Sequence, residues 1–223
     1  MSVFQSQLED AFPPATDAAV ILGVKQGVLL ANAALENELF LATPVGRDLR
    51  GHLRRAAVLF RIHELCKNGD LPFNSSIDRM PRGGGHWVEL HSGNFRAHIC
   101  RTDGPAAFPE DTPTRQDQRH SNQLDLFADN VVLLPGTENL ANCYAWLTFG
   151  VEGPSLGHVC WAMPKATRDE WLARINVIER AARNSVTAKD PEAPTKAMRL
   201  RFREHIEESL QKSEDSDNAK KTE

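Results

Sequence analysis

The chain has 223 residues, 41% of them apolar, and a formal net charge of -4 at pH 7. This length is enough for one substantial hydrophobic core or two small ones, and the mildly negative charge argues against strong nonspecific binding to DNA. The four cysteines, at positions 66, 100, 143 and 160, form no Cys-x-x-Cys pair, so reduced thiols are expected rather than a disulfide framework.

Targeting signals are not expected. No stretch of the chain is expected to approach the run of about 18 to 20 apolar residues needed to span a bilayer. Near its start lie Glu9 and Asp10, with no early Lys or Arg, which is unlike a secretion signal. A cytoplasmic protein is therefore expected.

The first regular segment covers residues 18 to 31, which are rich in aliphatic and β-branched side chains around Lys25, Gln26 and Gly27. This composition predicts two strands joined by a tight turn, with a buried helix as the alternative. From Gly46 to Lys67 the apolar period changes to 3.6, which predicts a helix, and Gly69 is a natural stop. The expected apolar face and the opposite basic face consist of Leu49, Leu53, Ala56 and Phe60, and of Arg47, Arg50, Arg54 and Arg61.

The arginine face, Arg47 to Arg61, has two interpretations. Clustered guanidinium groups are the usual electrostatic footprint of nucleic-acid contact, so the face raises the hypothesis of binding to the DNA backbone. The simpler interpretation is the solvated side of an amphipathic helix, because no interleaved aromatic residues or recognition motif accompany it. Direct binding of nucleic acid is therefore not expected.

Two hairpins are predicted next. After a flexible segment at residues 81 to 85, residues 86 to 101 form strands that meet at Ser92-Gly93-Asn94. Residues 143 to 151 and 156 to 163 flank a second turn at residues 152 to 155. Together with residues 131 to 134, these segments predict a largely antiparallel sheet of about four or five strands.

The last predicted elements complete an α+β fold. Thr167 and Glu170 have capping-box spacing and predict a helix whose buried stripe is Trp171, Ile175, Ile178 and Ala182. We therefore expect a single α+β domain over residues 1 to 185, with an exposed loop at 104 to 130. A linker, a charged helix near 197 to 211 and a disordered tail are expected within 186 to 223.

Chemistry-bearing residues are few. His98 and Cys100 share one predicted strand face, and His158 and Cys160 repeat the spacing, so four ligands would meet at a zinc ion if the two strands were neighbours. Buried thiols and hydrogen-bonded histidines are the plainer interpretation. Glu89, His91 and His98 form a second candidate, an acid-base cluster, but the chain has no phosphate loop, Gly-x-Ser-x-Gly or His-Glu-x-x-His motif. We expect neither catalysis, nor a metal, nor a cofactor.

The most specific motif is the pentapeptide Gln123-Leu124-Asp125-Leu126-Phe127. It follows the run from residue 104 to 122, whose three prolines and many polar residues are typical of a loop. Leu124, Leu126 and Phe127 supply apolar anchors for a pocket on a partner, and the amide of Gln123 both donates and accepts, which fixes the register. The alternative is that the three apolar side chains begin the next core element.

This pentapeptide resembles, at all five positions, the consensus by which bacterial replication and repair proteins bind the DNA sliding clamp. In those proteins the Gln enters a polar subsite and the final Leu-Phe pair fills a hydrophobic cleft of one clamp subunit. With its short length and lack of a catalytic signature, the chain is similar to the SocB family of toxins. The resemblance is specific only over residues 123 to 127.

The resemblance to the SocB family implies a function. It implies a protein that occupies the sliding clamp, competes with polymerase and other clients and stalls replication, while the adaptor antitoxin SocA delivers it to the ClpXP protease. Two other functions remain open: a clamp-tethered DNA repair or replication accessory protein, and an enzyme with a His/Cys site in the hairpins.

Overall fold

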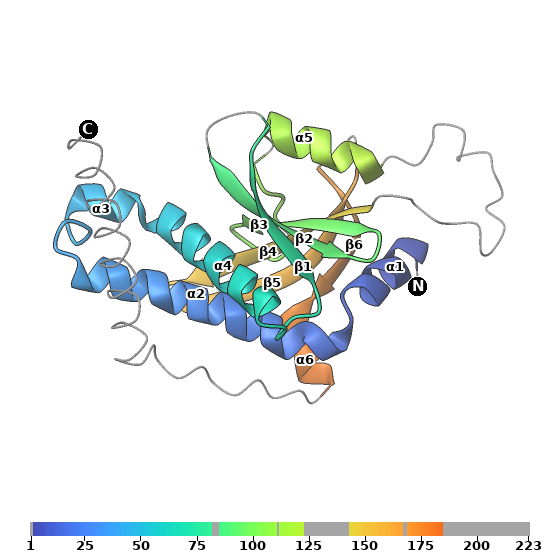
Figure 1. Ribbon diagram of the computed structural model, residues 1–223, viewed down its shortest axis with the longest axis horizontal. Helices are drawn as coiled ribbons and strands as arrows, with labels where there is room; N and C mark the ends of the chain where they lie inside the picture. Colours follow the sequence, from blue (N-terminus) through green and yellow to red (C-terminus); the bar gives the residue numbers. More distant parts are fainter. Residues whose placement is uncertain (1, 82–84, 111, 123–142, 167–168, 185–223) are drawn as a thin grey trace, which may run out of the picture. The chain divides into compact units, whose positions relative to one another are not determined.

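The computed structural model describes residues 2–81, 85–110, 112–122, 143–166 and 169–184. In these residues the chain folds into a mixed α+β structure around one six-stranded sheet (Figure 1). The helices are α1 (Val3–Ala11), η1 (Pro14–Thr16), α2 (Asp17–Asn37), α3 (Pro44–Asp48), α4 (Arg50–Lys67), α5 (Pro113–Arg119), η2 (His120–Asn122) and α6 (Val177–Arg183). The strands are β1 (Asn74–Arg79), β2 (His86–Ser92), β3 (Phe95–Arg101), β4 (Cys143–Glu152), β5 (Ser155–Pro164) and β6 (Trp171–Asn176).

The sheet has its strands in sequence order, β1 to β6, and every neighbouring pair is antiparallel except β3 and β4. This confirms the predicted α+β class and the largely antiparallel sheet. Both predicted hairpins are present, β2–β3 and β4–β5, and Gly93 (φ 58°) and Gly153 (φ 59°) supply the left-handed backbone that their tight turns require. Two strands, β1 and β6, were not predicted, and the predicted strand at residues 131 to 134 lies outside the described residues.

Both faces of the sheet are covered. On one face Ala97, Leu147 and Trp161 join a large apolar cluster with side chains of α1, α2 and α4. The opposite face carries a smaller cluster of Cys100, Tyr144 and Trp146, packed against Phe108 and Trp171. All residues of β4 from Cys143 to Gly150 are buried, because this central strand is enclosed on both sides.

Helix α2 corrects the prediction of two strands in residues 18 to 31. The segment is one helix of 21 residues, the alternative kept open above. The misleading residue is Gly27: a Cβ atom there would lie 2.6 Å from the Cα atom of Val58 on α4. Gly27 therefore permits the two helix backbones to approach closely, and does not mark a turn.

The apolar composition of α2 also corrects the expectation about membranes. Residues Pro14–Asn37 are long and apolar enough, by composition alone, to cross a bilayer. In the fold, however, Val20, Val24 and Val28 of this helix are buried in the large apolar cluster with α4 and the sheet. The side of the helix that carries these residues is therefore apolar because it packs in the core.

Helix α4 is confirmed, and so is its end: it stops at Lys67, and Gly69 adopts φ 80° just beyond. Its predicted apolar face is wrong, because Phe60 is 47% exposed and Leu49 45% exposed. The buried residues of the helix are Val58, Leu59, Ile62 and Leu65. These residues pack toward α2 and the sheet. Of the predicted basic face, Arg54 and Arg61 contact α2, whereas Arg47 and Arg50 are exposed to solvent.

The helix predicted after Thr167 begins later than expected. Trp171 and Ile175 lie in strand β6, and the helix starts at Val177. The capping residue is Asn176, whose Oδ1 accepts from the N–H of Glu179 at 3.2 Å while its Nδ2 donates to the Glu179 carboxylate at 2.7 Å. Thr167 itself lies outside the described residues.

A buried ion pair joins the beginning of α2 to α6. Arg180 donates from Nε to Asp17 Oδ2 at 2.8 Å and from Nη2 to Asp17 Oδ1 at 2.6 Å. The same Nη2 donates to the carbonyl of Phe12 at 2.8 Å. Asp17 is 0% exposed and Arg180 7%, so each charge depends on the other for its stabilisation.

The predicted boundary at residue 185 stays a prediction. The expected linker, charged helix and tail, residues 186 to 223, lie outside the described residues.

Candidate functional site

The clamp-like pentapeptide, Gln123, Leu124, Asp125, Leu126 and Phe127, lies outside the described residues. The structure does describe the two points between which it is inserted, Asn122 at the end of η2 and Cys143 at the start of β4. Both are buried, Asn122 with 2% and Cys143 with 0% of its surface exposed. The 20 residues from 123 to 142 therefore connect two buried residues, one in η2 and one in β4.

Asn122 is held by three hydrogen bonds at the end of the β4–β5 ladder. Its Oδ1 accepts from the backbone N–H of Tyr144 at 2.7 Å, and its Nδ2 donates to the carbonyl of Tyr144 at 2.8 Å and to that of Pro164 at 2.9 Å. Strand pairing ends with Trp146 opposite Ala162. Pro164 has no N–H to continue the ladder, so the Asn122 amide bridges the two strands in its place.

Cys143 fixes the other end of the insertion. Its N–H donates to the carbonyl of Asn94 at 2.9 Å, and it is paired with Phe95 in the parallel register of β3 and β4. Burial raises the pKa of its thiol to about 11, so at neutral pH it is an unreactive core residue.

The chain before the pentapeptide corrects the prediction of an exposed loop from residue 104. It covers the second face of the sheet and includes helix α5. Phe108 packs on Trp146 and Trp171, with ring centroids 4.9 Å and 4.7 Å apart. Arg119 is 6% exposed, donates to Asp169 at 2.8 Å and lies 5.5 Å from the centre of the Phe108 ring. Prolines and charges suggested a loop, but Phe108, Arg119 and Asn122 fix the segment to the sheet.

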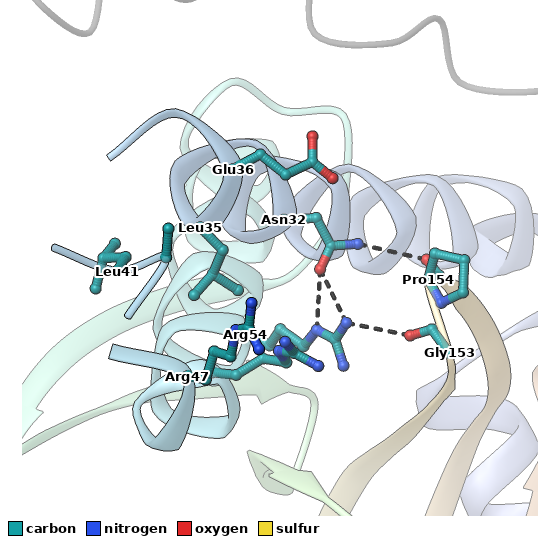
Figure 2. Close-up of a pocket in the computed structure, with 10 residues that line it drawn as sticks. Asn32, Leu35, Glu36, Leu41, Arg47, Arg54, Gly153 and Pro154 are labelled. Carbon is teal, nitrogen blue, oxygen red and sulfur yellow. Dashed lines mark hydrogen bonds between the residues drawn. The ribbon is translucent and has the colours of Figure 1, made fainter. Parts of the chain in front are cut away.

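A pocket lies where α2, α3 and α4 meet the turn between β4 and β5 (Figure 2). Its volume is about 520 Å³. It is lined by Asn32, Leu35, Glu36, Leu41, Ala42, Arg47, Arg50, Arg54, Gly153 and Pro154. Three of the four arginine residues of the predicted basic face are therefore gathered in one concave site.

Within this pocket Arg54 is fixed in place. Its Nε and Nη2 donate to Asn32 Oδ1 at 3.1 Å and 2.9 Å, and Nη2 also donates to the carbonyl of Gly153 at 3.1 Å. Partial burial, and then the charges of Arg50 and Arg101, lower the pKa of Arg54. Arg61, the fourth member of the predicted face, lies outside the pocket and donates to Gln26 at 2.6 Å.

The four proposed zinc ligands do not converge. His98 and Cys100 lie on β3, whereas His158 and Cys160 lie on β5, and β4 separates the two strands. The histidine nitrogens are also turned to other partners: those of His98 meet Glu89 and Tyr144, and Nε2 of His158 meets the Thr102 hydroxyl at 2.8 Å. Among the described residues, no group of three or more metal-binding side chains is found.

The acid-base cluster, in contrast, does come together. Glu89 contacts His98 at 2.9 Å through one carboxylate oxygen and His91 at 3.2 Å through the other. The second nitrogen of His98 meets Tyr144 Oη at 2.6 Å, and its ring stacks on Trp87 with a centroid distance of 3.8 Å. Both ring nitrogens are therefore occupied, and the ring is 4% exposed, which fits a structural network better than a catalytic one.

The pKa shifts agree with this structural role. Burial lowers the pKa of His98, and hydrogen bonding to His98 lowers the pKa of Glu89. A neutral imidazole therefore bridges a carboxylate and a phenol inside the fold. Tyr144 Oη also accepts from the indole N–H of Trp146 at 2.8 Å, which extends the network across the second face of the sheet.

Sequence reasoning missed the contacts of Asn32 and Asn122, and that of the Gly153 carbonyl with Arg54, because each joins residues distant in the chain. Comparisons of the chain with family models, with curated proteins and with solved structures find no match.

Proposed function

We propose that this protein binds the bacterial DNA sliding clamp through Gln123-Leu124-Asp125-Leu126-Phe127 and inhibits replication by excluding polymerase and other clients. The single observation that carries the proposal is the five-residue match to the clamp-binding consensus. Its action belongs in the cytoplasm, where a bacterial clamp works on DNA. No enzymatic step is part of the mechanism.

The geometry of the insertion supports this proposal. Asn122 and Tyr144 are hydrogen-bonded to each other, so a short connection is enough to join the two ends of the segment. The chain instead places 21 residues, 123 to 143, between Asn122 and Tyr144. Connections longer than about 12 to 15 residues are uncommon in compact domains, and binding loops are one of the usual reasons for them.

The inhibitory mechanism follows from competition for one cleft. A clamp subunit offers one such cleft, so a bound pentapeptide excludes any client whose peptide needs it. The fraction of clefts blocked rises with the ratio of protein concentration to dissociation constant. Abundance then sets the strength of inhibition, which suits control by proteolysis, and we include delivery by a SocA-like adaptor to ClpXP in the proposal.

The decisive experiment is a titration of purified clamp with the wild-type chain and with the triple variant Gln123→Ala, Leu126→Ala, Phe127→Ala. We expect the triple variant to lose at least 100-fold in affinity, because the polar register and two apolar anchors are removed together. The matched control, Thr137→Ala, Glu138→Ala, Asn139→Ala, alters three side chains of the same segment and should bind like wild type.

Circular dichroism and growth assays complete this test. The triple variant should keep the wild-type spectrum and should no longer inhibit growth when it is expressed. Unchanged clamp binding would refute the proposed site. Growth inhibition that persists after clamp binding is lost would refute the toxin mechanism, and an unfolded triple variant would place the three apolar side chains in the core.

A second candidate, a clamp-tethered repair or replication accessory protein, draws on the arginine residues. A continuous track for DNA needs several free guanidinium groups along one face. Arg54 and Arg61 are instead bonded to Asn32 and Gln26 of α2, which leaves Arg47 and Arg50 exposed. The accessory function predicts a salt-dependent DNA mobility shift that is lost in the Arg47→Glu, Arg50→Glu variant.

A further inference from the structure

The arginine pocket has the charge of an anion site. Arg47, Arg50 and Arg54 line it, and the single acidic residue on its wall is Glu36. Figure 2 shows Arg47 and Arg54 together on one side of the pocket and the Glu36 carboxylate turned away from them. Within the described part of the chain, no ion pair neutralises these three guanidinium groups.

The residues are arranged for joint contact with one group. Arg50 and Arg54 lie four residues apart on α4, a spacing that places them on one side of that helix, and Arg47 lies on the preceding helix α3. Arg54 uses Nε and Nη2 for its bonds to Asn32 and Gly153, and no described residue accepts from its Nη1, which carries two hydrogens. Like charges held close together raise the energy of the unoccupied pocket, and a bound anion relieves that repulsion. The lowered pKa of Arg54, caused by burial and by the nearby Arg50 and Arg101, agrees with this.

The preorganisation of Arg54 strengthens the case. Asn32 accepts two of its hydrogen bonds and itself donates to the carbonyl of Pro154 at 3.5 Å, which ties helix α2, helix α4 and the β4–β5 turn together (Figure 2). A guanidinium group that is already oriented loses little side-chain entropy when a ligand binds. Planar guanidinium groups also match the geometry of phosphate oxygens.

The remaining walls indicate more than a bare ion. Leu35, Leu41 and Pro154 give the pocket an apolar side. Its volume of about 520 Å³ lies in the range of about 300 to 1,000 Å³ that is typical of small-molecule sites. A ligand that contacts both the arginine side and the apolar side of the pocket carries a phosphate group at one end and a less polar body at the other.

We propose that this pocket binds a phosphate ester of nucleotide size, with its phosphates on Arg47, Arg50 and Arg54 and its body against Leu35 and Leu41. A concave, partly apolar site favours such a small molecule over the backbone of a nucleic acid, which needs an extended basic surface. None of the described lining residues belongs to the proposed clamp peptide, and this proposal does not depend on that one.

The test is calorimetric titration of the full chain with adenosine diphosphate and, separately, with inorganic pyrophosphate. The wild-type chain should bind adenosine diphosphate with a dissociation constant below about 1 mM, and the Arg47→Gln, Arg50→Gln variant at least tenfold more weakly, a loss of about 1.4 kcal/mol or more. Both substituted side chains are exposed, so the fold should survive.

The matched control is Arg79→Gln, Arg183→Gln, which removes the same charge from two exposed residues that do not line the pocket. It should bind adenosine diphosphate within twofold of wild type. Absence of binding by the wild-type chain at millimolar concentrations of both phosphates, or equal weakening in the two variants, would overturn the proposal.

A third arm distinguishes the source of the phosphate. A labelled 20-base-pair duplex is titrated by fluorescence anisotropy at 150 mM salt. Binding of the duplex that is tighter than that of adenosine diphosphate, and lost in the pocket variant, would assign the arginine residues to a nucleic-acid backbone and overturn the small-molecule site. Clamp affinity measured on the same pocket variant should be unchanged, so the failure of either proposal is seen independently of the other.

Discussion

Replacing Asn122 by Ala removes the bridge between β4 and β5 and leaves three buried backbone groups without this partner. These are the N–H and carbonyl of Tyr144 and the carbonyl of Pro164, all within 2.7 to 2.9 Å of the Asn122 amide. Each unsatisfied buried group costs about 1 to 3 kcal/mol, and carbonyls with a second partner lie at the low end, so we expect a total loss of about 3 to 5 kcal/mol. For a domain of this size that lowers Tm by about 10 °C.

Urea denaturation followed by circular dichroism measures this loss directly. The control is Asn68→Ala, the same substitution at an exposed residue, which should change the free energy of unfolding by less than about 0.5 kcal/mol. Equal unfolding midpoints for the two variants would refute the assignment of Asn122 as the anchor. Below its unfolding temperature, the Asn122→Ala protein should still bind the clamp, because the proposed contacts are made by the pentapeptide side chains.

Three further predictions concern the fold. Gly27→Ala should lower the free energy of unfolding by about 1 to 3 kcal/mol, since its Cβ meets the Val58 backbone at 2.6 Å and the helices must separate. Asp17→Ala should cost about 3 to 5 kcal/mol, because it leaves Arg180 buried and unpaired. Burial lowers the pKa of His98 in the folded protein, so as the pH falls this histidine is protonated in the unfolded chain before it is protonated in the folded one. The free energy of unfolding should therefore decrease below about pH 6.5, by at most about 1.4 kcal/mol per pH unit for this group. His98→Gln should make that decline shallower.

The three measurements have separate outcomes that would contradict them. Wild-type stability in Gly27→Ala would mean that the two helices do not touch at this position. A loss below about 1 kcal/mol in Asp17→Ala would mean that water reaches the ion pair. Equal pH slopes for wild type and His98→Gln between pH 6.5 and 5.5 would show that this histidine is not held neutral.

The elements that could be predicted were those whose cause is local. Gly93 and Gly153 lie in tight turns between strands, and both the turn residues and the aromatic and β-branched composition of the strands can be read within about ten residues. Gly69 likewise ends its helix through its own backbone conformation. In each case the physical cause lies in the residue itself or in its immediate neighbours.

The elements that were missed depend on distant partners. Gly27 is a residue type that is common in turns, but here it allows α2 to approach Val58 on α4 closely. The capping spacing at Thr167 was assigned to the helix start, whereas Asn176 and Glu179 have the same spacing and form the actual cap. Local patterns do not distinguish between such competing signals, and tertiary packing decides.

The same distinction applies to the candidate sites. The pentapeptide is a contiguous motif, so its resemblance is visible in the sequence alone. The arginine spacing was also visible, but the pocket is formed with Asn32 and Pro154, which are 122 residues apart in the chain and hydrogen-bonded to each other. The four proposed zinc ligands failed for the converse reason: their spacing was suitable, but strand order placed β4 between the two pairs.

The ion pair between Asp17 and Arg180 determines how the fold yields to mechanical force. An enzyme that pulls on the chain from its C-terminal side reaches α6 first among the described elements, and extracting that helix withdraws Arg180 from the interior. The Asp17 carboxylate then remains buried at the start of α2 without its positive partner, and a buried unpaired charge is strongly destabilising. Unfolding of α6 therefore destabilises the beginning of α2, near the other end of the described chain. We expect forced unfolding of the domain to be cooperative, with one threshold force.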